Sequence, residues 1–285
     1  MDEEAFLKAN YNSINIQEFN KVHDRQSSLL AQMIILNRVL MEINDFHHEV
    51  IKNSLDQTII EIMVQNLSSK LDNWQSNLPE YMHDTLENLH RYSSKNLGRI
   101  FVAVHLGYYH FGQLLFYGFL QEDGLLTSDT SSLAHTYATK CKSYAGRLCD
   151  IVYSASRTPG CNVLYTSAGA NIVIASTVQI HTLLFSSSED EICSARLRLE
   201  RNFAILTEMR THWPVLEVSF ARFRTFREEC RKNMDTAFRM DEWILRFLYG
   251  LAQPIEERPS YHEAEGKEGW LERGRNIWIG PGDWI

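Results

Sequence analysis

Apolar residues recur at helical spacing along most of the chain. Over residues 24–49 and 55–74 they stand three or four positions apart, as on one face of an α-helix. Asp24 and Asp56 lie where these two helices would begin, and a carboxylate there can accept hydrogen bonds from the first backbone amides. The pattern therefore predicts two amphipathic helices in the first quarter of the chain.

Two stretches, residues 100–121 and 158–188, contain no Asp, Glu, Lys or Arg. A helix that is apolar on nearly all sides must be enclosed by other helices or by lipid, and length alone would allow a membrane span. Both stretches carry His, Gln and other polar residues, and their flanks lack the Lys/Arg asymmetry typical of membrane proteins. We therefore expect two apolar central helices inside a helical globule and no contact with a membrane.

Further helices are predicted on either side of the second central stretch. Helical spacing resumes over residues 133–153 and 191–212. Pro214 suits the first turn of the next helix, where a missing N–H leaves no hydrogen bond unmade. Asp235 or Asp241 can start the last helix. Because no segment alternates in the manner of a β-strand, the sequence predicts an all-α fold.

The connections suggest how the chain is divided. Pro79 would end the second helix, because the residue before a proline is pushed away from helical backbone angles, and residues 77–96 are interpreted as mostly turn. The polar residues 121–132 form a linker at which the domain can be subdivided. We expect one large, irregular helical domain over residues 1–253. A tail rich in Trp and Gly follows over residues 254–285, and we expect part of it to pack back on the body.

Composition and charge narrow the class of protein. A hydrophobic content of 44% with 22% charged residues is typical of a folded globular chain. The formal net charge of -8 argues against binding nucleic acid through the overall field, since phosphate contacts need clustered Lys and Arg. Two Arg-rich runs, residues 196–201 and 222–232, alternate with core-type residues and are interpreted as solvated helix faces.

The chain carries no signature of a metal site or of a common catalytic mechanism. Its five cysteines form no C-x-x-C pair, which favours reduced, buried thiols in an intracellular protein. The acidic N-terminus does not resemble a signal peptide, so secretion is not expected. His47 and His48 are adjacent and therefore cannot share a helix face to chelate together. No phosphate-binding loop, zinc-protease motif or nucleophile elbow occurs, and we expect no cofactor and no metal.

Polar side chains inside the two apolar stretches are the candidate ligand-binding residues. The first stretch contributes His105, Tyr109 and Gln113, and the second contributes Asn171 and His181. Buried polar groups need hydrogen-bond partners. They either bond to neighbouring helices or line a small-molecule cavity, because such cavities are mostly apolar with a few convergent polar groups. If the two helices cross, both sets face one cavity.

Four blocks of the sequence, taken in order, resemble the fungal-specific transcription factor domain. This domain is the middle homology region that follows the binuclear zinc–six-cysteine DNA-binding module in fungal regulators. The matching blocks are LSSKLDNWQSNLP (residues 67–79), VHLGYYHFGQLLFYGFL (104–120), CKSYAGRLCDIV (141–152) and ARLRLERNFAILTEMRTHWPVLEVSFARF (195–223). The resemblance covers roughly residues 34–249. The six-cysteine cluster, its basic linker and the early part of the family domain have no counterpart in this sequence.

The resemblance implies a nuclear protein that regulates transcription in a fungal metabolic or biosynthetic pathway. It implies sensing of a small-molecule effector or of a protein partner, such as a full-length regulator. It does not imply direct DNA contact, because the residues that make such contacts are missing. Two alternatives remain open from the residues alone. One is a metal-independent enzyme of the cyclase or isomerase type that acts on an apolar metabolite, and the other is an interaction module that pairs with a full-length regulator.

Overall fold

The computed structural model describes residues 28–53, 55–121, 132–163, 165–234, 236–250 and 253–259. It is about 81% helical, and no strand occurs in those ranges, so the predicted all-α fold is confirmed. The α-helices are α2 (Leu29–Asn53), α3 (Gln57–Ser76), α4 (Leu86–Ser94), α5 (Gly98–Phe116), α7 (Ser132–Ser156), α8 (Thr166–Phe185), α9 (Glu189–His212), α10 (Glu217–Lys232) and α11 (Glu242–Tyr249). Short 3-10 turns precede α4 and α10: η3 (Glu80–Met82) and η4 (Pro214–Leu216).

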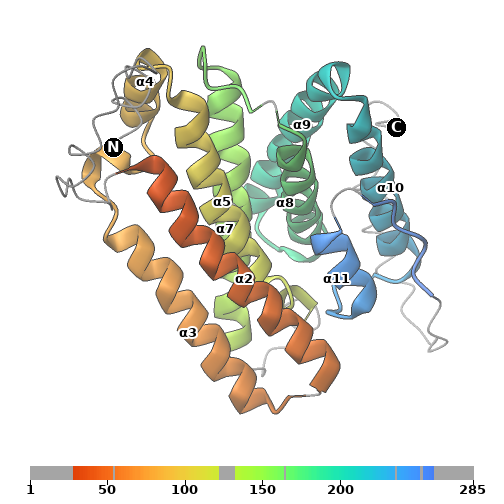
Figure 1. The fold of residues 1–285 in the computed structure, drawn as a ribbon. Coiled ribbons are helices and arrows are strands. Elements are labelled where there is room, and N and C mark those ends of the chain that lie inside the picture. The colour runs from red at the N-terminus through yellow and green to blue at the C-terminus, as the bar shows by residue number, and fades with distance from the viewer. Residues whose placement is uncertain are drawn as a thin grey trace.

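The helices pack in two groups that meet along α7 and α8. In the first group, α2 and α3 form a hairpin that lies against α5, and α5 packs most extensively against α7 (Figure 1). In the second group, α8 contacts α9 and α10, while α11 closes one end near α2. The two apolar helices α5 and α8 thus lie inside, and the amphipathic helices surround them.

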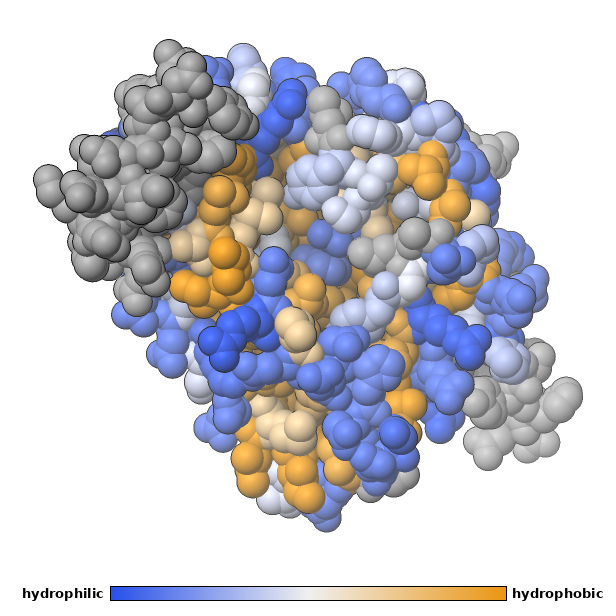
Figure 2. Space-filling model, viewed as in Figure 1, coloured by the Kyte–Doolittle hydropathy of each residue, from blue (hydrophilic) through white to orange (hydrophobic). Residues whose placement is uncertain are grey.

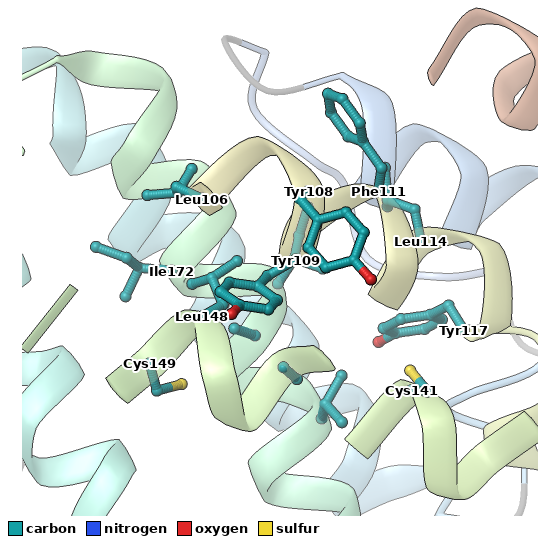
Figure 3. Packing of buried hydrophobic residues seen from close by; sticks show 14 of the residues in the cluster. Leu106, Tyr108, Tyr109, Phe111, Leu114, Tyr117, Cys141, Leu148, Cys149 and Ile172 are labelled. Carbon is teal, nitrogen blue, oxygen red and sulfur yellow. The ribbon is translucent and has the colours of Figure 1, made fainter. Parts of the chain in front are cut away.

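Helix α8 is buried on every side from Ala168 to Leu184. Within the described residues it is also the helix that is long and apolar enough to cross a membrane, but 94% of its most apolar window is buried inside the protein. Helix α5 is buried over most of its length as well, and Figure 3 shows Leu106 of α5 in the same region of the core as Leu148 of α7 and Ile172 of α8. The prediction of two apolar central helices is therefore confirmed.

Most predicted helix starts are confirmed where the structure describes them. The Asp56 carboxylate accepts a hydrogen bond from the Thr58 amide at 2.8 Å, and Asp241 caps α11 through the Ile244 amide at 2.9 Å. Asp24 and Asp235, the other two candidate caps, lie outside the described residues. Capping carboxylates satisfy amides that the first helical turn leaves without partners.

The interpretation of residues 77–96 as mostly turn is wrong, because this segment contains η3 and α4. The Thr85 hydroxyl caps α4 by accepting from the Asn88 amide at 3.1 Å. The Asn88 side-chain amide then donates to the carbonyls of Glu80 and His83, both at 2.9 Å. This short helix buries Leu89 and little else that is aliphatic, so its apolar pattern is too brief to stand out in the sequence.

The Arg-rich run 222–232 is not entirely a solvated face, because Arg222 is buried. Its guanidinium donates to the carbonyls of Gly250 at 2.8 Å, Gln253 at 2.7 Å and Arg246 at 3.1 Å, and also to that of Phe247. Burial lowers the pKa of Arg222 to about 10. The side chain therefore satisfies the last carbonyls of α11, which would otherwise be left without donors.

The beginning of the predicted tail packs back on the body, as expected. Arg258 is buried, and it donates to Asp241 Oδ2 through Nε at 3.0 Å and to the Thr236 carbonyl at 2.6 Å. The Trp243 indole donates to the Glu256 carbonyl at 2.8 Å. The segment 253–259 is therefore part of the folded body. The remainder of the tail, with Trp270, Trp278 and Trp284, lies outside the described residues, as do residues 122–131 of the expected linker.

The surface mixes hydrophilic residues with separate apolar patches (Figure 2). Large apolar side chains are exposed on α2 and α3: Leu30, Ile34, Ile35, Met41, Ile59 and Ile62. All five cysteines are free thiols, and four of them are buried as expected, whereas Cys193 is exposed.

Candidate binding recess

Three of the predicted site residues are held by hydrogen bonds inside the core. The His105 Nε2 atom lies 2.8 Å from the Met82 carbonyl, and the His181 Nε2 atom lies 2.8 Å from the Leu120 carbonyl. The Gln113 side-chain nitrogen lies 2.9 Å from His110 Nδ1. Burial lowers the pKa of His105, so its imidazole is neutral. The two histidines join backbone segments to α5 and α8, which is the first of the two roles that the sequence left open, whereas the Gln113–His110 contact lies within α5.

The two histidines of the polar sets contact different backbone segments. His105 contacts η3 near the start of α5, whereas His181 reaches the carbonyl of Leu120 beyond the end of α5. Met82 precedes α5 in the chain, whereas Leu120 follows it. Asn171 is buried on α8. The structure therefore does not bring His105 and His181 to a common partner, and a shared cavity stays a prediction.

Tyr109 is the predicted residue that reaches a polar cluster at the surface. Its hydroxyl donates to Asp84 Oδ2 at 2.7 Å, and Arg147 Nη2 donates to the same oxygen at 2.9 Å. The Arg147 guanidinium also lies over the Tyr109 ring, 5.7 Å from its centroid. Burial and the neighbouring Asp84 carboxylate raise the pKa of Tyr109, so its hydroxyl remains a donor. The cluster joins the η3–α4 loop, α5 and α7.

A second ion pair lies next to this cluster on α7. Arg198 of α9 donates to both oxygens of Asp150, from Nε at 3.1 Å and from Nη2 at 2.9 Å. This side-on, two-bond geometry is the strong form of an Arg–carboxylate pair. Gly146 makes room for it, because a Cβ atom there would lie only 3.0 Å from Arg198 Nη1.

A recess of about 130 Å³ opens beside the two ion pairs, between the start of α4 and one face of α7. On α7 its residues are spaced i, i+3, i+4 and i+7, which places them on one helical stripe. Buried Leu89 and Ile151 supply its apolar lining. The residues that line it are Asp84, Thr85, Leu86, Leu89, Arg147, Asp150, Ile151 and Ser154.

Some polar groups of the recess have hydrogen-bonding capacity to spare. All hydrogen bonds of Arg147 within the described part of the chain leave from Nη2, so Nε and Nη1 donate to none of those residues. Asp84 likewise accepts only through Oδ2. The Arg147 side chain is 52% exposed and the Asp84 side chain 17% exposed. The recess can therefore offer both donors and an acceptor to a ligand.

Metal binding finds no support in the described ranges, where no group of three or more His, Cys, Asp or Glu residues could hold an ion. The recess brings together only two carboxylates, and guanidinium groups pair with both of them. The groups that line the recess can interact with a ligand through charge and hydrogen bonds.

Comparison of the chain with protein-family models, with curated proteins and with solved structures finds no match in any of the three. The resemblance to the fungal-specific transcription factor domain stays a prediction, and the site is interpreted from its own geometry.

Sequence reasoning missed most of the recess. Asp84 lies in the segment interpreted as turn, and its partner Arg147 is 63 positions away in the chain. Asp150 and Arg198 are 48 positions apart. The sequence signal that could have indicated the recess is the stripe of charged and hydroxyl residues on α7. A solvated helix face shows the same pattern, so the stripe alone does not identify a site.

Proposed function

We propose that this chain is a regulatory protein of the fungal-specific transcription factor type, which senses a small molecule or a protein partner and reaches DNA only through another protein. The order of the four resembling blocks and the all-α fold support this proposal. The net charge of -8 agrees with the absence of direct DNA contact. A nuclear location and a pathway-specific regulatory role follow from the same resemblance.

The observation that carries the proposal is the recess beside Tyr109. Arg147 and Asp84 have unused hydrogen-bonding groups there, and they belong to a cluster that joins three separate elements. A molecule that pairs with Nε or Nη1 of Arg147 shares the guanidinium with Asp84, which is bound through Nη2. Its binding therefore changes how the η3–α4 loop is held against α5 and α7, and a sensor needs such differential contacts.

The enzyme alternative has less support. A general base needs an imidazole or carboxylate within reach of a substrate, and His105 and His181 are buried and bonded to backbone carbonyls. The recess of about 130 Å³ is also small beside the ~300 Å³ or more of a typical metabolite pocket. Recognition therefore suits the site better than cyclisation or isomerisation.

A reporter assay tests the regulatory role. The full chain is fused to an unrelated DNA-binding domain in fungal cells, upstream of a reporter gene. We expect reporter output to differ from that of the DNA-binding domain alone, and Arg147→Gln to change that output. Arg91→Gln is the matched control, because Arg91 of α4 is similarly exposed but lies outside the recess. A fusion without any effect on the reporter contradicts the proposal.

A gel-shift assay with the unfused chain tests the absence of direct DNA contact. We expect no retained complex at low salt. A tight complex whose affinity falls steeply with added salt would contradict this part of the proposal, because that dependence marks phosphate contacts.

A further inference from the structure

The charged groups around the recess are balanced and alternate in sign. Asp84 and Arg147 are in contact at 2.9 Å, and the Asp150–Arg198 pair follows along α7. Two carboxylates and two guanidinium groups sum to zero formal charge. A ligand with one net charge would therefore be attracted by one group and repelled by its neighbour. A ligand with one positive and one negative group avoids this penalty.

The distance between the unused hydrogen-bonding groups of the recess sets the distance between the charged groups of the ligand. Arg147 Nη1 and Asp84 Oδ1 belong to side chains that already touch each other. A carboxylate on Arg147 and an ammonium group on Asp84 must therefore be close neighbours in the ligand. Two such groups on the same carbon atom meet this condition, and a guanidinium–carboxylate contact is among the stronger hydrogen bonds in proteins.

The lining and the volume limit the rest of the ligand. Leu89 and Ile151 line the recess but are only 2% and 3% exposed, so the apolar surface that they offer to a ligand is small. The volume of about 130 Å³ is slightly smaller than the ~150 Å³ of an engineered cavity that accepts benzene. A drug-sized molecule or a whole aromatic amino acid is too large, whereas an amino acid with a short branched aliphatic side chain is close to this size.

The geometry points to a small zwitterion as the ligand of the recess, namely a free α-amino acid with a short aliphatic side chain, of about the size of valine. Its carboxylate binds Arg147, its ammonium group binds Asp84, and its side chain lies against Leu89 and Ile151. This assignment rests on the proposed function, in that the recess is taken as the place where the regulator senses its effector.

Titration calorimetry on the full, unaltered chain tests the ligand class with three compounds of nearly equal shape. They are L-valine, isovalerate, which lacks the ammonium group, and isobutylamine, which lacks the carboxylate. We expect saturable binding of L-valine, and binding at least about tenfold weaker for each analogue, since each loses one charged hydrogen bond. Equal binding of valine and either analogue, or no saturable binding of valine, overturns the assignment.

Two variants test the location of binding. Arg147→Gln should weaken valine binding, and Asp84→Asn should abolish the preference for valine over isovalerate. Arg91→Gln is the control and should change neither. Circular dichroism establishes that each variant is folded, and the three-compound comparison decides the question if one is not. Unchanged valine binding by folded Arg147→Gln overturns the assignment.

The valine-binding experiments and the reporter assay can fail independently of each other. Reporter activity without valine binding overturns the ligand class and leaves the regulatory role standing. Valine binding by a chain that leaves the reporter unchanged overturns the regulatory role instead.

Discussion

The Tyr109 hydroxyl donates a hydrogen bond to Asp84 at 2.7 Å, and this contact fixes the loop before α4 onto α5. Because the same carboxylate oxygen also accepts from Arg147, the tyrosine stabilises one wall of the recess without blocking it.

Tyr109→Phe should therefore destabilise the protein by about 1.5–3 kcal/mol, the usual range for a hydrogen bond to a charged group. Urea unfolding followed by circular dichroism measures the change. Tyr81→Phe is the matched control, because Tyr81 is 42% exposed, and it should change the free energy of unfolding by less than about 0.5 kcal/mol. A Tyr109→Phe variant as stable as its control would show that the contact contributes nothing.

Two glycines of α5 should respond in opposite ways to alanine. A Cβ atom at Gly112 would lie 2.5 Å from Tyr144 Cε1, so Gly112→Ala forces α5 and α7 apart and should cost about 1–3 kcal/mol or more. At Gly107 the nearest heavy atom would be Phe111 Cζ, at an ordinary 3.7 Å. Gly107→Ala should be neutral or stabilising by up to about 1 kcal/mol, since alanine favours a helix interior. Thermal unfolding of both variants checks the contrast, and equal effects would refute it.

Acid should destabilise the fold through its buried histidines. Burial lowers the pKa of His47 to about 4 and that of His110 to about 3, from 6.5. Between these values and pH 6.5 the unfolded chain binds protons that the folded chain does not. The free energy of unfolding is therefore highest above pH 6.5. It falls as the pH drops below 6.5, by about 2 kcal/mol per histidine at pH 5.

Urea unfolding at pH 7 and pH 5 measures this loss. His47→Gln should make the difference in the free energy of unfolding between pH 7 and pH 5 smaller by about 2 kcal/mol. His212→Gln, at an exposed position at the end of α9, should leave it unchanged. The explanation fails if His47→Gln keeps the full loss of stability between the two pH values.

Removal of the Arg222 guanidinium should weaken the attachment of α11. Arg222→Met leaves carbonyls at the end of α11 without donors, and each buried group left in this state costs about 1–3 kcal/mol. In the Arg222→Met variant, we expect the exchange of backbone amides to become faster in α11 than in the unaltered protein. The increase in α11 should exceed any increase in α5. Arg224→Met, on the same helix but 36% exposed, is the control and should not alter the exchange of α11. Unchanged exchange in Arg222→Met would show that the guanidinium does not hold α11 in place.

The sequence predicted the helices well because burial of an amphipathic face leaves a local periodic trace. Helices α5 and α8 were identifiable because charged residues are costly inside a core, and both stretches lack them. Helix α4 was missed because its few apolar residues form no visible stripe. The recess could not be predicted, since Asp84 meets Arg147 only after tertiary folding, and a charged residue on a helix does not reveal its partner.

Arg222 was misjudged, and the burial of Arg258 was not predicted, for one physical reason. A guanidinium is hydrophilic in any scale, yet five planar donors let it replace water completely when several carbonyls or carboxylates converge. Arg258 finds this environment between Asp241, Glu229 and the carbonyls of Thr236 and Arg239. The acceptors that surround each guanidinium lie at the ends of other helices or in loops. The spacing of residues within one helix therefore cannot predict that they come together.

The burial of Arg258 also decides how short a version of this protein can be. A chain ended at residue 253, where the helical pattern stops, would retain Glu229, which is only 5% exposed, with its countercharge removed. It would also leave the Trp243 indole without its acceptor. The smallest version fit for crystallisation or ligand screening should therefore extend at least through residue 259.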